Sequence, residues 1–427
     1  MRLLLWFLGL FAVAVASALF AGNNDSTVTL FWPPYRVDLS LNLVILSGVV
    51  IFVVLYAALR ALATLVALPG QAQRWRVQHQ AHAIHLGLLD TLTYLASGRF
   101  TRARKAAQDV LAQERTLARD EQALPYRARL RAITHLLAAE GAHALQDRAE
   151  RDEHLRLALA QASRRKEPEV RDGLHLRAAR WAFDDRDAPT AKQQLEDLSG
   201  GAARRTLALR LRFKVARLAH ETRLALETAR LLAKHRAFSP ASSQSLIRVL
   251  ALELIGSAHD PAQLEKVWTQ MDEVERAMPD VATVAAQRLL QLGGDISLSL
   301  QWLLPIWEQL IHPQASLSQD QRVKLILALE RSFAASEGQI DSTWLARIES
   351  AQMKNPRDAL LQYLAGVICM HLNLWGKAQQ MLKQALPRLQ DEDIQRRAWR
   401  ALAVLAEQRD DAVAAAQAWR QAAGHSD

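Results

Sequence analysis

Two uncharged apolar runs dominate the hydrophobic pattern at the N-terminal end of the chain. Residues 3–21 and 41–59 each have about the length that a helix needs to cross a bilayer. Because lipid offers no hydrogen-bond partners to the backbone, both runs predict transmembrane helices. We therefore expect a two-helix transmembrane hairpin over residues 1–66, with a short external loop over 22–40.

The first run has a second interpretation. Arg2, a short apolar core and an Ala-Ser-Ala sequence also fit a cleaved secretory signal. However, Ala14, Ala18 and Gly22 form a ladder of small residues suited to close packing against another helix. Whether the first segment is cleaved stays open, and either outcome leaves the second run as an anchor.

The expected external loop carries residues suited to a membrane surface. Trp32 and Tyr35 flank Pro33 and Pro34. Tryptophan and tyrosine favour the headgroup layer because their rings are apolar at one end and polar at the other. Prolines prevent the connection from continuing as a helix. We expect Trp32 and Tyr35 to lie at the membrane interface.

Positive charge next to the apolar runs predicts their orientation. Arg60, Arg74 and Arg76 follow the second run and Arg2 precedes the first, whereas Arg36 is the one basic residue of the loop. Basic residues are enriched on the cytoplasmic side of bacterial inner membranes. The expected protein is a multi-pass inner-membrane protein with both termini and the remaining chain in the cytoplasm.

From about residue 75 onward, helical periodicity replaces the long apolar runs, and short turn signals recur. The stretch 356–389 resembles a tetratricopeptide repeat: Gly366 takes the small position of the first helix, and Ala378, Leu382 and Ala385 follow the small–large–small spacing of the second. The same spacing occurs eight more times, beginning at residues 103, 151, 191, 225, 264, 300, 344 and 415. The fold class predicted after the membrane hairpin is an all-α, tetratricopeptide-like solenoid of helical hairpins, over residues 161–427.

Composition narrows the function classes. The 427-residue chain has a formal charge of +9 and a pI near 9.9. Its basic residues alternate with acidic ones along the expected helices and gather after the second apolar run, which fits a surface near anionic lipid and excludes a nucleic-acid partner. The single cysteine, Cys369, permits no internal disulfide and suits a reducing compartment.

The order of these features resembles the HemY proteins of proteobacteria. The resemblance is carried by the two apolar runs, "LPGQAQRWR" at 68–76, "SGRF" at 97–100 and "HLLAAEGAHALQDRAERDEHL" at 135–155. It implies an inner-membrane tetratricopeptide-repeat protein associated with late protohaem IX biosynthesis. It also implies that residues 67–160 form a juxtamembrane helical region specific to the family.

Sequence motifs for catalysis are missing. The chain contains no G-x-G, no G-x-x-x-x-G-K-[ST], no G-x-S-x-G and no H-E-x-x-H. We therefore expect no enzyme activity and no resident cofactor. His79, His82 and His85 share part of one helix face and are candidate haem or metal ligands. The alternative is an ordinary polar helix face.

Two further sets of residues are candidates for partner binding, because the first helix of each hairpin lines the concave face of such arrays. The basic candidates, which could pair with carboxylates of a protein tail or of a porphyrin, are Arg180, Arg210, Lys214 and Arg217, beside Phe183. The apolar candidates, suited to a partner helix, are Leu360, Tyr363 and Val367. Arginines on solvated helices are the alternative for the basic set.

These observations favour a membrane-tethered helical-repeat scaffold. Through the resemblance, we expect it to organise late haem-synthesis enzymes such as ferrochelatase or protoporphyrinogen oxidase, and haem or porphyrin contact is an open extension. Tethering would raise the local concentration of such partners. The alternatives are a general membrane-tethered assembly adaptor unrelated to haem and a protein that itself binds haem or a metal.

Overall fold

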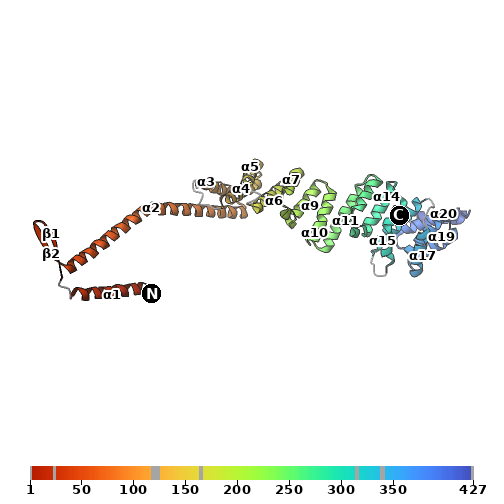
Figure 1. The fold of residues 1–427 in the computed structure, drawn as a ribbon. Helices are drawn as coiled ribbons and strands as arrows, with labels where there is room; N and C mark the ends of the chain where they lie inside the picture. Colours follow the sequence, from red (N-terminus) through yellow and green to blue (C-terminus); the bar gives the residue numbers. More distant parts are fainter. Residues whose placement is uncertain are drawn as a thin grey trace. The chain divides into compact units, whose positions relative to one another are not determined.

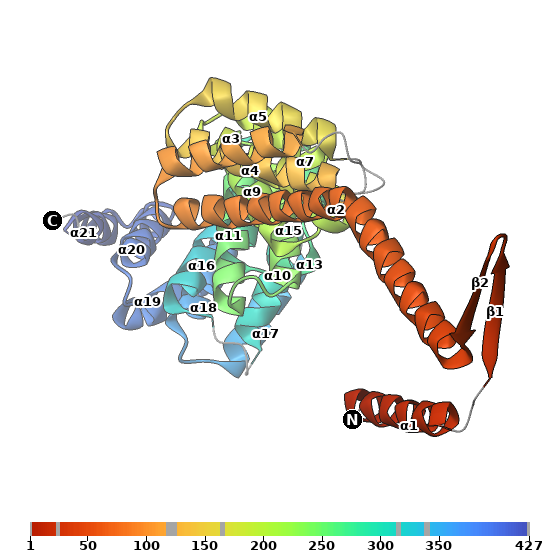
Figure 2. The same cartoon turned by 90° about the vertical axis from the view of Figure 1, so that its left-hand side faces the viewer.

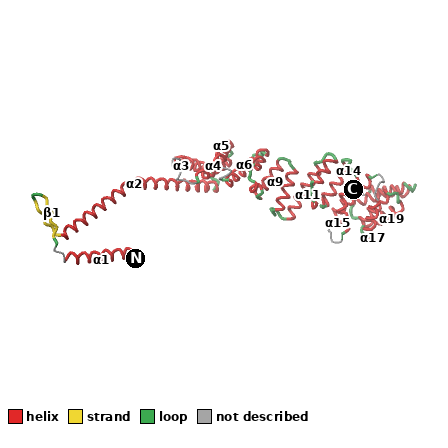
Figure 3. Tube along the Cα trace, viewed as in Figure 1, coloured by secondary structure: helices red, strands yellow, loops and turns green. Residues whose placement is uncertain are grey.

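The structure is a computed structural model that describes residues 2–22, 26–116, 126–162, 167–312, 317–336 and 342–424. The chain divides into two compact units, Met1–Glu167 and Pro168–Asp427. Within the described ranges most residues are helical, and Figure 3 shows strand, in yellow, at the β1–β2 hairpin. The helical class predicted from the sequence is therefore confirmed.

The first unit combines the apolar segments with two helical hairpins. Its elements are α1 (Arg2–Gly22), β1 (Thr27–Trp32), β2 (Tyr35–Ser40), α2 (Leu41–Ala96), α3 (Phe100–Thr116), α4 (Arg127–Ala144) and α5 (Arg148–Gln161). The end of α2 packs against α3, and α4 packs against α5. A small core around Ile84, Val110 and Leu130 joins α2, α3 and α4.

One described helix is long and apolar enough to cross a membrane. It is the first part of α2, Leu41–Ala63, and none of it is buried inside the protein. The helix predicted for the second span is therefore present, and it continues without a break into the first helical hairpin. Helix α1 covers the first predicted span, but its described apolar part, Phe7–Leu19, is shorter. The two-span hairpin stays a prediction.

The expectation of an entirely α-helical chain is wrong between the two apolar helices. There, β1 and β2 pair as an antiparallel hairpin whose turn is Pro33-Pro34 (Figures 1 and 2). The reason is local: "TVTLFW" and "YRVDLS" alternate in polarity every second residue and are rich in β-branched and aromatic residues. The loop expected over 22–40 thus has regular structure.

The second unit is a succession of helices that follow one another in sequence order (Figure 1). The helices of its N-terminal part are α6 (Pro168–Asp184), α7 (Ala188–Glu196), α8 (Gly200–Ala203), α9 (Thr206–Leu218), α10 (Thr222–Lys234), α11 (Pro240–Gly256), α12 (Pro261–Thr269) and α13 (Glu273–Arg276). The remaining helices are α14 (Pro279–Gln291), α15 (Ile296–Ile311), α16 (Gln319–Ala335), α17 (Ser342–Lys354), α18 (Ala359–His371), α19 (Trp375–Ala385), α20 (Glu392–Glu407) and α21 (Ala412–Ala423), with the 3₁₀ turn η2 (Leu386–Arg388) after α19.

The same tight turn joins the two helices of many hairpins. A residue with positive φ ends the first helix, and the next backbone N–H returns to a carbonyl five residues earlier, as in Asp187 N–H to Ala182 O at 2.8 Å. The residues with positive φ include Gly98, Gln146, Arg186, His220, Gly293, Asn373 and Asp410. An aspartate often follows and caps the next helix, as Asp147, Asp187 and Asp411 do.

The spacing of four and then three residues marks the second helix of each hairpin, as the sequence predicted, and the copy on α19 has the small–large–small residues. Ala378, Leu382 and Ala385 are fully buried on α19, and Leu382 packs against Gly366 of α18. The other copies begin on α3, α5, α7, α10, α12, α15, α17 and α21. Their first residues are buried in every case. Small residues allow close helix approach, and the large one fills the space between hairpins.

Candidate partner-binding groove

The first helices of successive hairpins in the second unit lie side by side and form an open groove. Helix α11 packs against α14, and α14 packs against α16. The groove has a volume of about 710 Å³, and the short helix α13 forms its remaining wall. Its lining residues come from four segments: Ala241, Gln244, Ser245 and Arg248; Glu273 and Val274; Ala277 to Asp280; and Gln321.

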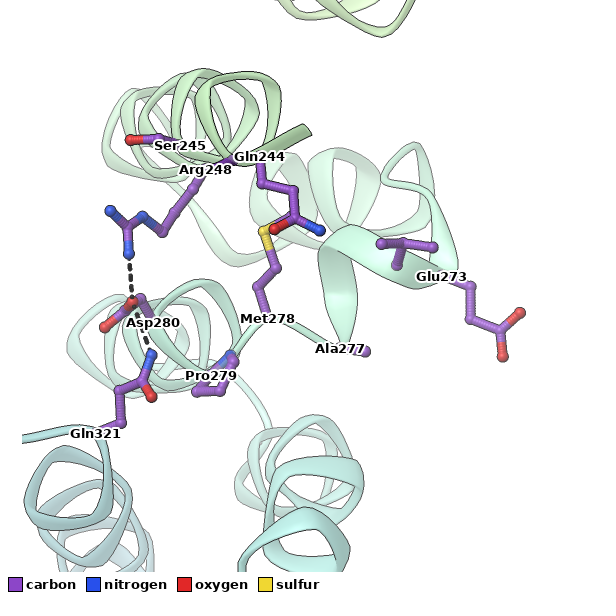
Figure 4. Close-up of a pocket in the computed structure, with 11 residues that line it drawn as sticks. Gln244, Ser245, Arg248, Glu273, Ala277, Met278, Pro279, Asp280 and Gln321 are labelled. Atoms are coloured by element: carbon purple, nitrogen blue, oxygen red, sulfur yellow. Dashed lines mark hydrogen bonds and ion pairs between the residues drawn. The ribbon is translucent and has the colours of Figure 1, made fainter. Parts of the chain in front are cut away.

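A charged cluster on Asp280 crosses one side of this groove. Arg248 Nη1 donates to Asp280 Oδ2 at 3.2 Å, and Gln321 Nε2 reaches the same oxygen at 3.4 Å (Figure 4). Lys324 Nζ lies 3.8 Å from Asp280 Oδ1 and 2.6 Å from an Asp320 carboxylate oxygen. The Asp320 hydrogen bond raises the pKa of Lys324. Three helices thus share one carboxylate, which fixes this side of the groove.

The opposite side of the groove is mainly apolar, and Glu273 is its charged residue. Val274 is 68% exposed, and Figure 4 shows Met278 directed toward Gln244 across the opening. Ala277 and Pro279 complete this wall. A surface with an apolar wall and a polar edge can bind a short protein segment, because it takes apolar side chains while satisfying backbone polar groups.

The structure brings part of the predicted basic set together on α6 and α9. Lys214 Nζ lies 5.9 Å from the centre of the Phe183 ring, which is cation–π geometry. Arg180 and Lys214 are both exposed. Arg210 donates to Ala237 O at 3.0 Å and lies 5.7 Å from the Phe238 ring. Arg210 therefore supports the turn before α11.

Arg217 has a structural partner as well. Its guanidinium donates to Glu253 on α11, and Thr222 Oγ1 donates to the other oxygen of that carboxylate at 3.0 Å. The hydrogen bond from Arg217 lowers the pKa of Glu253. This pair joins two neighbouring first helices. Of the predicted basic residues, Arg180 and Lys214 are thus the ones best placed to meet a partner.

The prediction that α18 presents an open apolar surface to a partner is wrong. Leu360, Tyr363 and Val367 are all buried in the hydrophobic core of the second unit. The reason is that α16 and α20 both pack against α18 and cover the face expected to be open. Burial also raises the pKa of Tyr363 and that of Glu330 on α16, whereas Arg397 on α20 partly offsets the effect on Glu330.

The three candidate ligands on α2 lie close in sequence but do not converge. His79 stacks on Trp75 with ring centres 5.3 Å apart, and His82 is exposed. His85 Nδ1 is 2.7 Å from Ala81 O, so this nitrogen carries the proton and Nε2 is left as an acceptor. Within the described residues, no group of three or more His, Cys, Asp or Glu is arranged to hold a metal ion. These histidines therefore do not fit a resident metal ion.

Sequence reasoning also missed a histidine pair in the first unit. His135 Nδ1 on α4 lies 2.9 Å from His154 Nδ1 on α5, and His154 Nε2 lies 3.8 Å from a Glu150 oxygen. Desolvation by burial lowers the pKa of His135 to about 4 and also lowers that of His154. Both residues stand in the stretch quoted for the family resemblance, which was the available signal. The groove around Asp280 was missed because its residues come from four separated segments.

Together, the apolar span and the stacked helix pairs define a class: membrane-associated proteins with a helical-repeat domain. The particular family follows from comparison. Residues 26–146 match the family described as HemY protein N-terminus, so the HemY resemblance predicted from the sequence is confirmed for this part of the chain. No curated protein matches the chain.

Solved structures with similar helix arrangements are distant. The chain is 16% identical to a chain of the APC/C hetero-tetramer Cut9–Hcn1, with a TM-score of 0.28, over 78% of this chain and 64% of that one. For Naa15/Naa10 bound to HypK-THB the identity is 13% and the TM-score 0.25, over 76% and 56%. For the P58(IPK) TPR domain the identity is 14% and the TM-score 0.21, over 76% of this chain and 99% of that one. The chain thus spans less than two thirds of the first two.

Proposed function

We propose that this protein is an inner-membrane scaffold without enzyme activity of its own, whose cytoplasmic helical-repeat domain organises enzymes of late haem biosynthesis. Its partners in this proposal are ferrochelatase and protoporphyrinogen oxidase. The match of residues 26–146 to the HemY family supports the pathway. The span Leu41–Ala63 supports the anchorage, and the basic residues after it support the cytoplasmic orientation.

The groove between α11, α13, α14 and α16 is the observation that carries the scaffold role. It is open, has one apolar wall and is held in shape by the Arg248–Asp280 pair. The exposed Lys214 and Arg180 lie on first helices earlier in the same unit. A partner segment with apolar anchors and acidic residues would complement these features. Holding two enzymes on one anchored array raises their effective concentration without any new catalytic group.

A charged residue on the apolar wall tests the proposal. Val274→Glu places a carboxylate in the groove but removes no core packing, because Val274 is 68% exposed. Val413→Glu on α21 is the matched control, since Val413 is 80% exposed and does not line the groove. The measurement is quantitative mass spectrometry of ferrochelatase and protoporphyrinogen oxidase recovered with the full-length protein in mild detergent.

We expect Val274→Glu to lower the recovery of at least one enzyme by about tenfold, equivalent to about 1.4 kcal/mol of binding free energy, and Val413→Glu to leave it unchanged. If the parent protein recovers neither enzyme, the haem-scaffold proposal is wrong. If both variants recover them equally, the partner site lies elsewhere than in this groove.

Direct contact with haem is a second candidate function, favoured by His85 alone. The backbone carbonyl of Ala81 holds the proton of His85 on Nδ1, and His85 is exposed, so Nε2 carries the lone pair that a metal would bind. When bound, haem would supply an iron that such an imidazole nitrogen can coordinate. A Soret band in the purified protein that is lost in His85→Ala but kept in His82→Ala would support this candidate. A colourless preparation that also fails to bind added haem would exclude it.

A further inference from the structure

The β1–β2 hairpin has one polar and one apolar face, which follows from its register. Partners directly opposite each other share a face, and successive pairs alternate between faces. The pairs Thr27–Ser40, Thr29–Asp38 and Phe31–Arg36 therefore form one face. The pairs Val28–Leu39, Leu30–Val37 and Trp32–Tyr35 form the other. Every member of the second set is apolar or an amphipathic aromatic residue.

On the polar face, the side chains of the hairpin contact one another. Arg36 Nε lies 3.3 Å from Asp38 Oδ1, and the Arg36 guanidinium lies 5.5 Å from the centre of the Phe31 ring. Phe31, the one large apolar residue on this face, is 73% exposed and lies beside a charged group that stays hydrated. This face is suited to water.

Most of the apolar face is open, although Val28 and Leu39 at its base are half-buried where α2 contacts the two strands. Trp32 is 73% exposed and Tyr35 72%, and Leu30 and Val37 are about half exposed. A two-stranded hairpin alone is marginally stable in water, and an apolar face of this kind gains stability when another surface removes it from water. The hairpin therefore needs a partner surface on this side.

The base of the hairpin is tied to the start of the membrane span. Ser40 ends β2 and also caps α2, accepting a hydrogen bond from Leu43 N–H at 3.3 Å. Leu41 N–H donates to Ser26 O at 2.9 Å, which links the other end of the hairpin to the same helix turn. The hairpin is thus followed directly by the apolar helix segment Leu41–Ala63. If α2 crosses a bilayer, the hairpin therefore lies at the membrane surface where the span begins.

We propose that the β1–β2 hairpin lies on the lipid surface at the entry point of α2, with its apolar face in the interfacial layer and its polar face in water. Trp32 and Tyr35, at the far end of the hairpin, would form a second anchor point away from the span, because both rings favour that layer. The hairpin would thereby restrict tilt and rotation of α2 on the side opposite the repeat domain. The inference rests on the proposed anchorage by α2.

A label scan along β1 tests this placement. The lone cysteine, Cys369, is buried and is replaced in a Cys369→Ala background. Single variants Thr27→Cys, Val28→Cys, Thr29→Cys and Leu30→Cys then carry an environment-sensitive fluorophore in the full-length protein, reconstituted in vesicles of phosphatidylethanolamine and phosphatidylglycerol. Nitroxide-labelled lipid quenches from the membrane side and iodide quenches from water.

We expect alternation with a period of two. Labels at 28 and 30 should be quenched several times more strongly by the nitroxide lipid than labels at 27 and 29, and iodide should show the opposite order. Equal iodide quenching at all four positions would overturn the proposal, because the hairpin would then stand in water. Protection of 28 and 30 from both quenchers, relieved when more lipid lowers the protein density in the vesicles, would also overturn it in favour of a second copy of the chain.

A label in the span separates this result from the anchorage itself. Val49 is exposed on α2 within Leu41–Ala63, and a Val49→Cys label should be quenched by the nitroxide lipid if α2 crosses the bilayer. Quenching at 49 without alternation on β1 refutes the hairpin placement alone. No quenching at 49 refutes the anchorage.

Discussion

Gly366 lies on α18 where that helix packs closely against α19, so a larger residue at this position would collide with α19. A Cβ added there would lie 2.7 Å from Leu382 Cγ, 2.9 Å from Leu382 Cδ2 and 3.3 Å from the Ala378 carbonyl oxygen. Leu382 is fully buried, so its branch point cannot simply turn away. Overpacking of this kind costs about 1–3 kcal/mol. In the opposite direction, replacing glycine by alanine within a helix stabilises that helix by about 1 kcal/mol, because alanine has the higher helix propensity.

We therefore expect Gly366→Ala to destabilise the α18–α19 hairpin by about 1 kcal/mol net, the difference between these two effects. Gly376→Ala is the matched control, because the nearest atom to its added Cβ is Arg409 Nη2 at 3.7 Å, an ordinary contact. That change should be neutral or should stabilise α19 slightly. A structure in which α18 and α19 were not in close contact would give both variants the same sign.

Hydrogen–deuterium exchange of the full-length protein in detergent measures the effect, because repeat hairpins open locally and each 1.4 kcal/mol changes amide protection about tenfold. Peptides from α18 and α19 should exchange faster in Gly366→Ala and not in Gly376→Ala. In a Leu382→Ala background the added methyl has space, so Gly366→Ala should become neutral or stabilising there. Equal protection of the two single variants, or no rescue in that background, would refute the close contact.

Two further predictions concern the first unit. Glu114 is fully buried and accepts hydrogen bonds from Arg127 and Arg131, so Glu114→Gln should destabilise the α3–α4 packing by about 3 kcal/mol, measured as lost amide protection in both helices. His135 has a pKa of about 4 and that of His154 is also lowered, so the unfolded chain binds more protons between pH 4 and 6.5. The free energy of unfolding should be highest above pH 6.5 and should fall by about 2 kcal/mol toward pH 4. His135→Gln should reduce this pH dependence in thermal unfolding. An unchanged pH profile in that variant would contradict burial of the neutral pair.

Much of the fold could be predicted because its signals are local. Ala378 and Ala385 with Leu382 between them predict the second helix α19, since the close approach of two adjacent helices depends on side chains within a single turn or two. The span at Leu41–Ala63 is equally local, because a bilayer demands one uninterrupted apolar run. The strands of the β-hairpin also have a local signal, the alternating polarity of residues 35–40, but Pro33 and Pro34 predict a turn-rich loop over the same segment.

The groove and the fate of individual charges could not be predicted in the same way. Arg217 and Lys214 occupy similar positions in the sequence pattern, yet Arg217 pairs with Glu253 on the next first helix, whereas Lys214 stays exposed beside Phe183. Which of them is paired depends on how far α11 rotates and shifts against α9. That displacement is set by packing between hairpins and has no local sequence signal.

The sequence by itself thus determined the helical hairpins, their small–large–small packing positions and an apolar span, because periodicity and length act within one element. Only the tertiary structure decided that Tyr363 is buried and that Arg248 meets Asp280, because each depends on packing between helices that are not adjacent in the chain. The physical reason is that a side chain's environment in a repeat array is supplied mostly by the neighbouring repeats.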